Sequence, residues 1–223
     1  MTLPPWLQGL PDPERMRATD RWAIEEQGIP GLELMERAGR GLADLVIAVA
    51  PEGPIAIACG KGNNGGDGYV AARLLREAGR EVRVLAVAPV AELTGDARAN
   101  AERVDGVEPF EATRLRDCAV AVDALLGTGF SGVPHGAVAD AIAALNAAGL
   151  PAVAADVPSG IDAATGVAEG EAIRVRATAT FAAAKPGLWI NPGKSNAGAV
   201  RVVDIGIPPG APVRPRAPPA TRT

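Results

Sequence analysis

The sequence predicts a three-layer α/β/α fold: a Rossmann-like, doubly wound and mostly parallel sheet with an N-terminal helical extension. Short apolar runs alternate along the chain with stretches whose apolar residues recur at helical spacing. Hydrophobic residues make up 48% of the chain, but aromatic residues only 3%. Such a composition suits strands that are buried on both faces under closely packed helices.

Two helices are expected before the first strand. Apolar residues recur at helical spacing over 16–24 and again over 32–46, and a Gly-Ile-Pro-Gly break separates the two segments. Residues 1–13 are rich in proline and are expected to form an extended N-terminal arm. We therefore expect a domain over 14–208, followed by a proline-rich tail or linker over 209–223.

The remaining elements are expected to alternate. Strands are predicted at 55–58, 82–87, near 107, and at 119–126, 152–155, 177–184 and 199–204, and helices at 67–78, 94–104 and 136–148. In a parallel sheet of this kind, ligands bind outside the carboxyl ends of the strands.

A glycine-rich stretch, 59–68, joins the first strand to its helix. Gly60, Gly62 and Gly65 have the G-x-G-x-x-G spacing that lets backbone N–H groups approach a phosphate. The second strand ends without the carboxylate that a dinucleotide dehydrogenase uses to bind ribose. Asn63, Asn64 and Asp67 instead add side-chain oxygens, which favours a phosphate-bearing ligand with a cation nearby; the alternative is a tight surface turn.

Two further strand ends carry polar residues. Asp123 precedes the glycine-rich loop 125–132, and Asp156 and Ser159 follow the strand at 152–155. Because carboxyl ends of parallel strands share one edge, these loops and the glycine-rich stretch are expected to form one crevice.

Composition excludes several classes of function. The net charge of −4 offers no basic face for nucleic acid. No apolar span predicts a membrane helix, and the N-terminus lacks the order of a signal peptide, so a soluble cytoplasmic protein is expected. Cys59 and Cys118 read as buried small hydrophobes, and His135, the one histidine, as a loop residue without a chemical role.

Five segments together resemble one known family. They are Leu-Met-Glu-x-Ala-Gly at 34–39, the glycine-rich stretch with Asn-Asn-Gly-Gly-Asp-Gly, Asp-Ala-Leu-Leu-Gly-Thr-Gly at 123–129, Asp-Val-Pro-Ser-Gly-Ile-Asp at 156–162 and Asp-Ile-Gly-Ile-Pro at 204–208. Their order and content resemble the NAD(P)H-hydrate epimerase family, the YjeF N-terminal-type domain. The resemblance implies a potassium-dependent isomerase that interconverts the R and S epimers of hydrated NADH and NADPH during nicotinamide nucleotide repair.

The resemblance also implies site residues. Asn64, Asp123 and Ser159 correspond to potassium ligands, and Asp156 lies against the damaged nicotinamide. The substrate-binding loops would comprise Asn63, Asn64, Gly65, Gly66 and Asp67, and Gly127, Thr128, Gly129, Phe130, Ser131, Gly132 and Val133.

Two catalytic assignments are hypotheses from the chemistry. Epimerisation at a carbon that bears both a hydroxyl and the ring nitrogen needs proton removal and proton donation, and Asp156 could do both by switching roles. Lys185 follows a strand, where it could donate a proton, contact phosphate or simply be solvated.

The resemblance leaves partners and rivals open. A homodimer and a separate NAD(P)H-hydrate dehydratase are the expected partners. A non-catalytic, nucleotide-binding dimerisation domain of the same fold is the main alternative, and an ordinary NAD-dependent oxidoreductase is the third.

Overall fold

The computed structural model describes residues 9–211, and its centre is a seven-stranded sheet. Every strand pairs in parallel with its neighbours, in the order β3-β2-β1-β4-β5-β6-β7. The strands are β1 (Ile55–Cys59), β2 (Val82–Ala86), β3 (Val107–Pro109), β4 (Val120–Ala124), β5 (Ala152–Ala155), β6 (Ala177–Phe181) and β7 (Ala199–Val203). The predicted doubly wound fold is confirmed.

The strands are buried on both faces, and alternate residues serve different cores. Ile55 and Ile57 of β1 pack in the larger cluster with helices on one face, whereas Ala56 and Ala58 belong to a second cluster on the other face. The second face of β1 therefore carries small side chains, whereas its first face carries branched ones. The low aromatic content therefore corresponds to a core built from alanine, valine, leucine and isoleucine.

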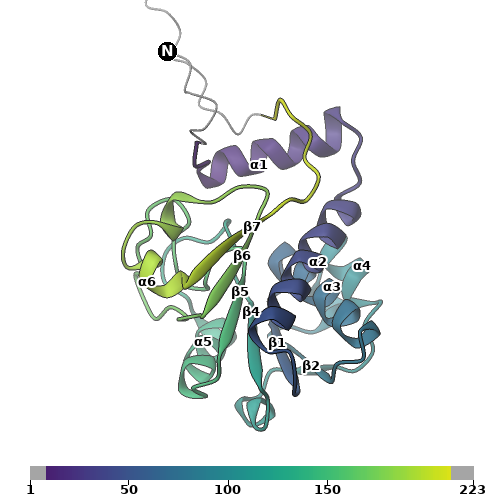
Figure 1. The fold of residues 1–223 in the computed structure, drawn as a ribbon, viewed down its shortest axis with the longest axis vertical. Helices are drawn as coiled ribbons and strands as arrows, with labels where there is room; N and C mark the ends of the chain where they lie inside the picture. Colours follow the sequence, from purple (N-terminus) through teal and green to yellow (C-terminus); the bar gives the residue numbers. More distant parts are fainter. Residues whose placement is uncertain (1–8, 212–223) are drawn as a thin grey trace, which may run out of the picture.

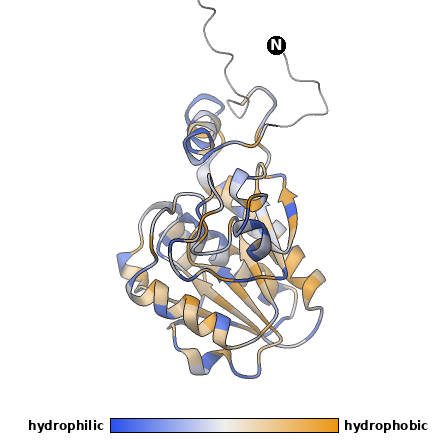
Figure 2. Cartoon of the chain, turned by 90° about the vertical axis from the view of Figure 1, so that its left-hand side faces the viewer, coloured by the Kyte–Doolittle hydropathy of each residue, from blue (hydrophilic) through white to orange (hydrophobic). Residues whose placement is uncertain are grey.

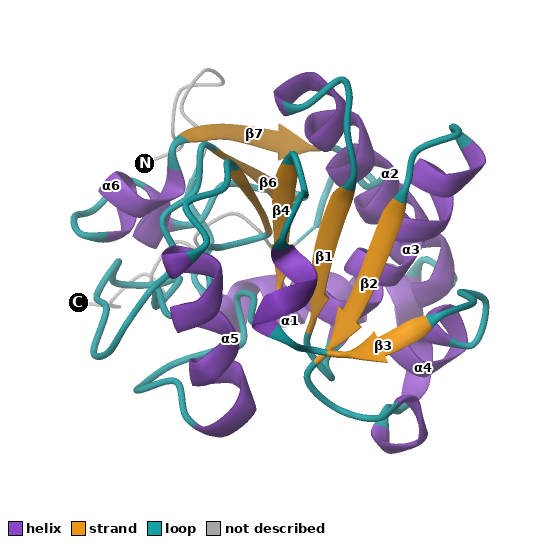
Figure 3. Cartoon of the chain, turned by 90° about the horizontal axis from the view of Figure 1, so that it is seen from below, coloured by secondary structure: helices purple, strands orange, loops and turns teal. Residues whose placement is uncertain are grey.

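Helices cover both faces of the sheet (Figures 1 and 3). One layer holds α2 (Gly31–Val49), α3 (Asn63–Glu77) and α4 (Gly95–Ala101), and the other holds α5 (Gly136–Ala147). A short helix, α6 (Gly193–Ala197), precedes the edge strand β7. Figure 2 shows hydrophobic residues concentrated along the strands between these layers.

The N-terminal extension is helical, as predicted. Helix α1 (Pro13–Arg21) begins where the Asp12 carboxylate accepts a hydrogen bond from the Arg15 amide at 2.8 Å, and it continues into one π-helical turn, Trp22–Glu26. It lies above the carboxyl ends of the strands, apart from both helical layers (Figure 1).

Some element boundaries differ from the expectations. Helix α3 begins at Asn63 rather than at residue 67, so the Asn-Asn-Gly-Gly-Asp run forms its first turns. No helix was predicted from the sequence over 193–197, where the structure has α6. Most of the expected arm and tail lies outside the described residues. None of the helices within 9–211 has the length and apolar character needed to cross a membrane.

Candidate functional site

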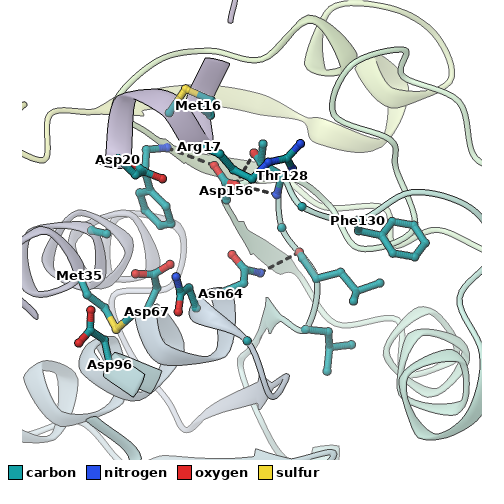
Figure 4. A pocket seen from close by; sticks show the side chains of 18 of the residues that line it. Met16, Arg17, Asp20, Met35, Asn64, Asp67, Asp96, Thr128, Phe130 and Asp156 are labelled. Carbon is teal, nitrogen blue, oxygen red and sulfur yellow. Dashed lines mark hydrogen bonds between the residues drawn. The ribbon is translucent and has the colours of Figure 1, made fainter. Parts of the chain in front are cut away.

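A cavity of about 710 Å³ opens at the carboxyl ends of β1, β4 and β5, beneath α1. The strand order reverses between β1 and β4, the point at which doubly wound sheets bind ligands. Figure 4 shows side chains from α1, α3 and the strand-end loops pointing into this cavity. The three loops predicted to share one crevice do so.

Glycines in the first loop let two backbone segments touch. A Cβ on Gly60 would lie 2.0 Å from the Leu125 carbonyl oxygen, and one on Gly65 would lie 1.9 Å from the Gly60 carbonyl oxygen. Both contacts are with backbone, which cannot move aside cheaply. Gly62, at the N-cap of α3, has nothing within 4 Å of its Cβ position. Gly60 and Gly65 therefore fix the start of α3 against the loop after β4, and the helix N-terminus opens into the cavity at Gly62.

Oxygen atoms from three elements gather behind the cavity wall. The Asp123 carboxylate accepts hydrogen bonds from the Ser159 hydroxyl at 2.6 Å and from the Ser159 amide at 2.8 Å. The Leu126 amide donates to the Ser159 hydroxyl at 2.9 Å, and the Leu126 carbonyl accepts from Asn64 Nδ2 at 2.8 Å. Leu126 thus links Asn64 to the Asp123–Ser159 pair, although Asp123 and Ser159 do not themselves line the cavity.

The chemistry of this cluster suits a hard monovalent cation. Asn64 Oδ1 is buried and has no hydrogen-bond partner among the described residues, so this acceptor is free to bind an ion. Burial raises the pKa of Asp123 to about 6, against the opposing effect of the Ser159 hydrogen bonds. All the candidate donors are oxygens, which potassium prefers to nitrogen or sulfur. The residues present therefore fit a potassium ion.

Asp156 is held in place by hydrogen bonds on both carboxylate oxygens. Oδ1 accepts from Lys185 Nζ at 2.5 Å, and Oδ2 accepts from the Thr128 amide at 2.9 Å and the Thr128 hydroxyl at 2.5 Å. Its φ of 63° lies in the left-handed region that a non-glycine residue rarely adopts. A strained backbone and a fully engaged carboxylate fix the side chain at the cavity floor.

Lys185 is almost completely buried, with 1% of its side chain exposed. Its ammonium donates to Asp156, to the Thr180 hydroxyl at 3.0 Å and to the Phe181 carbonyl at 2.8 Å. An ammonium has three N–H donors, and all three are used. Burial alone would raise the pKa of Asp156, but the Lys185 charge and the Lys185 and Thr128 hydrogen bonds outweigh it and lower that pKa.

Three more carboxyl groups line the same cavity from the helices, those of Asp20, Asp67 and Asp96 (Figure 4). Asp67 on α3 is 8% exposed, and burial together with nearby Asp156 raises its pKa well above the ordinary value. Burial likewise raises the pKa of Asp20 on α1, with Lys185 opposing the shift and Asp156 adding to it. The surroundings of Asp156 therefore stabilise its anion, whereas those of Asp20 and Asp67 disfavour ionisation.

The structure separates the other predicted residues. Asn63, Asn64, Asp67 and 127–130 line the cavity, whereas Gly65, Gly66 and 131–133 do not. Gly66 instead abuts Met35, since a Cβ there would lie 2.6 Å from the Met35 sulfur, and Val133 is 55% exposed.

Sequence reasoning missed the part of the cavity formed by α1. Met16, Arg17 and Asp20 of α1 line the cavity. Lys61 and His135 line it as well, although the sequence predicted no chemical role for His135. Met16 and Asp20 are four residues apart and so share one helix face. An acid on the buried face of an amphipathic helix was the available signal.

Known proteins with similar sequences cover most of the chain. NAD(P)H-hydrate epimerase from Rhodopirellula baltica is 42% identical over 203 residues, covering 87% of this chain and 83% of the relative. NAD(P)H-hydrate epimerase from Pirellula staleyi is 40% identical, covering 91% and 94%. The bifunctional NAD(P)H-hydrate repair enzyme Nnr of Salinibacter ruber is also 40% identical, but this chain spans only 40% of that longer protein.

A solved structure has the same fold. The crystal structure of the yeast protein YNL200c superposes with a TM-score of 0.76 over 84% of this chain and 86% of the yeast chain, at 22% identity. Residues 31–187 match the family model described as YjeF-related protein N-terminus. The chain belongs to that family.

Proposed function

We propose that this protein is an NAD(P)H-hydrate epimerase, which interconverts the R and S epimers of hydrated NADH and NADPH. The proposal rests on the similarity to two relatives with that name. One is 42% identical over 87% of this chain, and the other is 40% identical over 91%. The cavity supports it, because it combines a helix N-terminus open to a phosphate, an oxygen-rich cluster and a fixed carboxylate.

The phosphates of the substrate would bind at the start of α3. The first N–H groups of a helix lack intrahelical partners and carry partial positive charge. Gly62 leaves this end open, and Lys61 adds a cation on the cavity wall. Because Asp20, Asp67, Asp96 and Asp156 also line the cavity, a positively polarised end is needed to bind an anionic dinucleotide.

Asp156 is the proposed base. Its lowered pKa keeps the carboxylate ionised at neutral pH, so it can accept the proton of the substrate hydroxyl. Lys185 acts as a positioning residue, since its three donors are engaged and none is left to contact a phosphate. Of the roles that the sequence left open for Lys185, support of the Asp156 charge is the one we propose.

Potassium would be held by Asn64, Asp123 and Ser159. The unpartnered Asn64 Oδ1 is the structural feature that favours the site. When bound, the ion would supply positive charge that offsets phosphate charge in a protein of net charge −4. Replacing potassium with sodium should lower turnover, and Asn64→Ala should raise the potassium concentration required for half-maximal activity by at least about tenfold, as expected for loss of an important metal contact.

We further propose that the protein acts in the cytoplasm as a homodimer, beside a separate NAD(P)H-hydrate dehydratase. Similarity to part of a protein named bifunctional NAD(P)H-hydrate repair enzyme supports a link between this epimerase and a second repair activity. Two free, buried cysteines suit a reducing compartment.

The test uses an R/S mixture of hydrated NADPH with an S-specific dehydratase, in potassium and again in sodium. Recovery of NADPH absorbance is followed with and without this protein. Rapid consumption of the residual R epimer only in the presence of this protein and potassium is the expected result. If the protein changes nothing in either salt, a nucleotide-binding scaffold becomes the better account.

A further inference from the structure

Four carboxyl groups line one cavity, those of Asp20, Asp67, Asp96 and Asp156, but among the described residues only Asp156 has hydrogen-bond partners. Asp156 has hydrogen bonds on both oxygens and an ion pair with Lys185. Asp20 and Asp67 interact with the described residues through charge alone, without a hydrogen bond that would stabilise the anion. Helix α1, which carries Asp20, precedes the matched residues 31–187, so the family match assigns it no role.

Electrostatics disfavours the simultaneous ionisation of Asp20, Asp67 and Asp156. Lys185 neutralises Asp156, and the other cations on the cavity wall, Arg17 and Lys61, are exposed to solvent. Two further anions beside Asp156 would repel one another and an anionic substrate in a partly desolvated site. This repulsion favours a proton on one of the helix carboxyl groups.

Asp20 is better placed than Asp67 to deliver that proton repeatedly. Asp67 is buried in the first turns of α3, whereas Asp20 is half-buried and can regain a proton from water. Helix α1 lies over the strand ends, and Asp156 follows β5 at the cavity floor (Figures 1 and 4). A ring bound between them would have a carboxyl group on each side.

We propose that Asp20 is the general acid of the epimerisation, paired with Asp156 as the general base. Asp156 takes the hydroxyl proton, the oxygen lone pair forms a carbonyl, and the bond from that carbon to the ring nitrogen breaks. The nitrogen keeps the bonding pair and receives the proton of Asp20. After rotation exposes the other carbonyl face, the nitrogen attacks the carbon and returns its proton to Asp20, while Asp156 protonates the oxygen. No proton is gained or lost overall.

This assignment rests on the proposed function, and one series of variants tests it. Asp20→Asn keeps the size of the side chain but cannot donate this proton, Asp20→Glu restores a carboxyl group, and Glu14→Gln removes an exposed carboxyl from the same helix. Each is assayed by consumption of the R epimer across the pH range, with the thermal midpoint measured alongside.

For Asp20→Asn we expect kcat to fall about 10²- to 10³-fold with KM changed less than about threefold, because general acids contribute on this scale. The fall in activity at alkaline pH, where the wild-type acid loses its proton, should disappear. Asp20→Glu should retain that alkaline limb, and Glu14→Gln should match the wild type.

Two results would overturn the assignment. One is kcat of Asp20→Asn within about threefold of the wild type; the other is a folded Asp20→Glu protein that lacks the alkaline limb while the wild type has it. Wild-type protein inactive in potassium would instead reject the proposed epimerase function itself, so the two failures are distinguishable.

Discussion

The cavity has one wall formed by strand ends and another formed by helices. Both walls carry aspartates, but the surroundings of these aspartates differ. The strand wall consists of Asp156 with its partners Thr128 and Lys185, and every hydrogen bond there favours the anion. The helix wall consists of Asp20 and Asp67, which are desolvated without such partners. Because the aspartates of both walls are shielded from water, their hydrogen-bond partners account for the difference in pKa. Environments that shift two pKa values in opposite directions distinguish a base from an acid.

The largest expected effect is the loss of the anion on the strand wall. Asp156→Asn should lower kcat by about 10²- to 10⁴-fold, because a general base is removed, and should leave the Lys185 ammonium buried without its counter-charge. The measurement is steady-state consumption of the R epimer, with urea unfolding to follow stability. Turnover near that of the wild type would reject Asp156 as the base.

A pair of lysine substitutions tests whether the charge of Lys185 supports the Asp156 anion. Lys185→Met keeps much of the side-chain volume and removes the ammonium, so the pKa of Asp156 should rise and the acidic limb of the pH profile should move to higher pH. Lys61→Met, on the exposed part of the cavity wall, should raise KM without moving that limb. The same acidic limb in wild type and Lys185→Met would show that Lys185 does not support the base.

The start of α3, the helix that carries Asp67, depends on close packing of a glycine, and a pair of substitutions should show this. Gly65→Ala would place a Cβ 1.9 Å from the Gly60 carbonyl oxygen, and should reduce the free energy of unfolding by about 2–3 kcal/mol. Gly62→Ala, with nothing within 4 Å, should stay within about 0.5 kcal/mol. Urea denaturation of both variants is the measurement, and equal stabilities would contradict the packing role.

The two glycines also show what the sequence can reveal and what it cannot. The G-x-G-x-x-G spacing predicted a strand, a turn and a helix in the correct order, because apolar periodicity and glycine positions are local signals. It did not show that helix α3 begins at Asn63, since contact between Gly65 and the Gly60 backbone is a property of packing.

The candidate site was predictable where residues directly follow strands. Asp123, Asp156 and Ser159 were grouped from the rule that parallel strands end at one edge of the sheet. Asp20 was missed, because it lies on a helix outside the alternating pattern, and only the tertiary fold brings that helix over the strand ends. The engagement of all three Lys185 donors is likewise a matter of tertiary geometry.

The smallest expected effect is a difference of sign in the pH dependence of stability. The lowered pKa of Asp156 means that its carboxylate stabilises the fold above the ordinary value of 3.8, and this contribution is lost as pH falls through the lowered pKa. Asp67 has a raised pKa, so its ionisation reduces stability as pH rises above 3.8 toward that raised value.

Asparagine substitutions should reveal both signs in urea unfolding measured from acidic to neutral pH. Relative to the wild type, the free energy of unfolding of Asp156→Asn should fall toward neutral pH, whereas that of Asp67→Asn should rise. The rise should exceed about 0.5 kcal/mol, the size typical of surface substitutions. If the two variants shift stability in the same direction as pH rises, the contrast between the walls is wrong.

The most direct test of that contrast is a carbon-13 NMR titration of the aspartate carboxyl groups, with Asp20→Asn, Asp67→Asn and Asp156→Asn used to assign the resonances. We predict that Asp156 titrates below 3.8 and that Asp20 and Asp67 titrate above it, because of their different environments. Titration of all three groups together near 3.8 would contradict it, because the strand wall and the helix wall would then not separate base from acid.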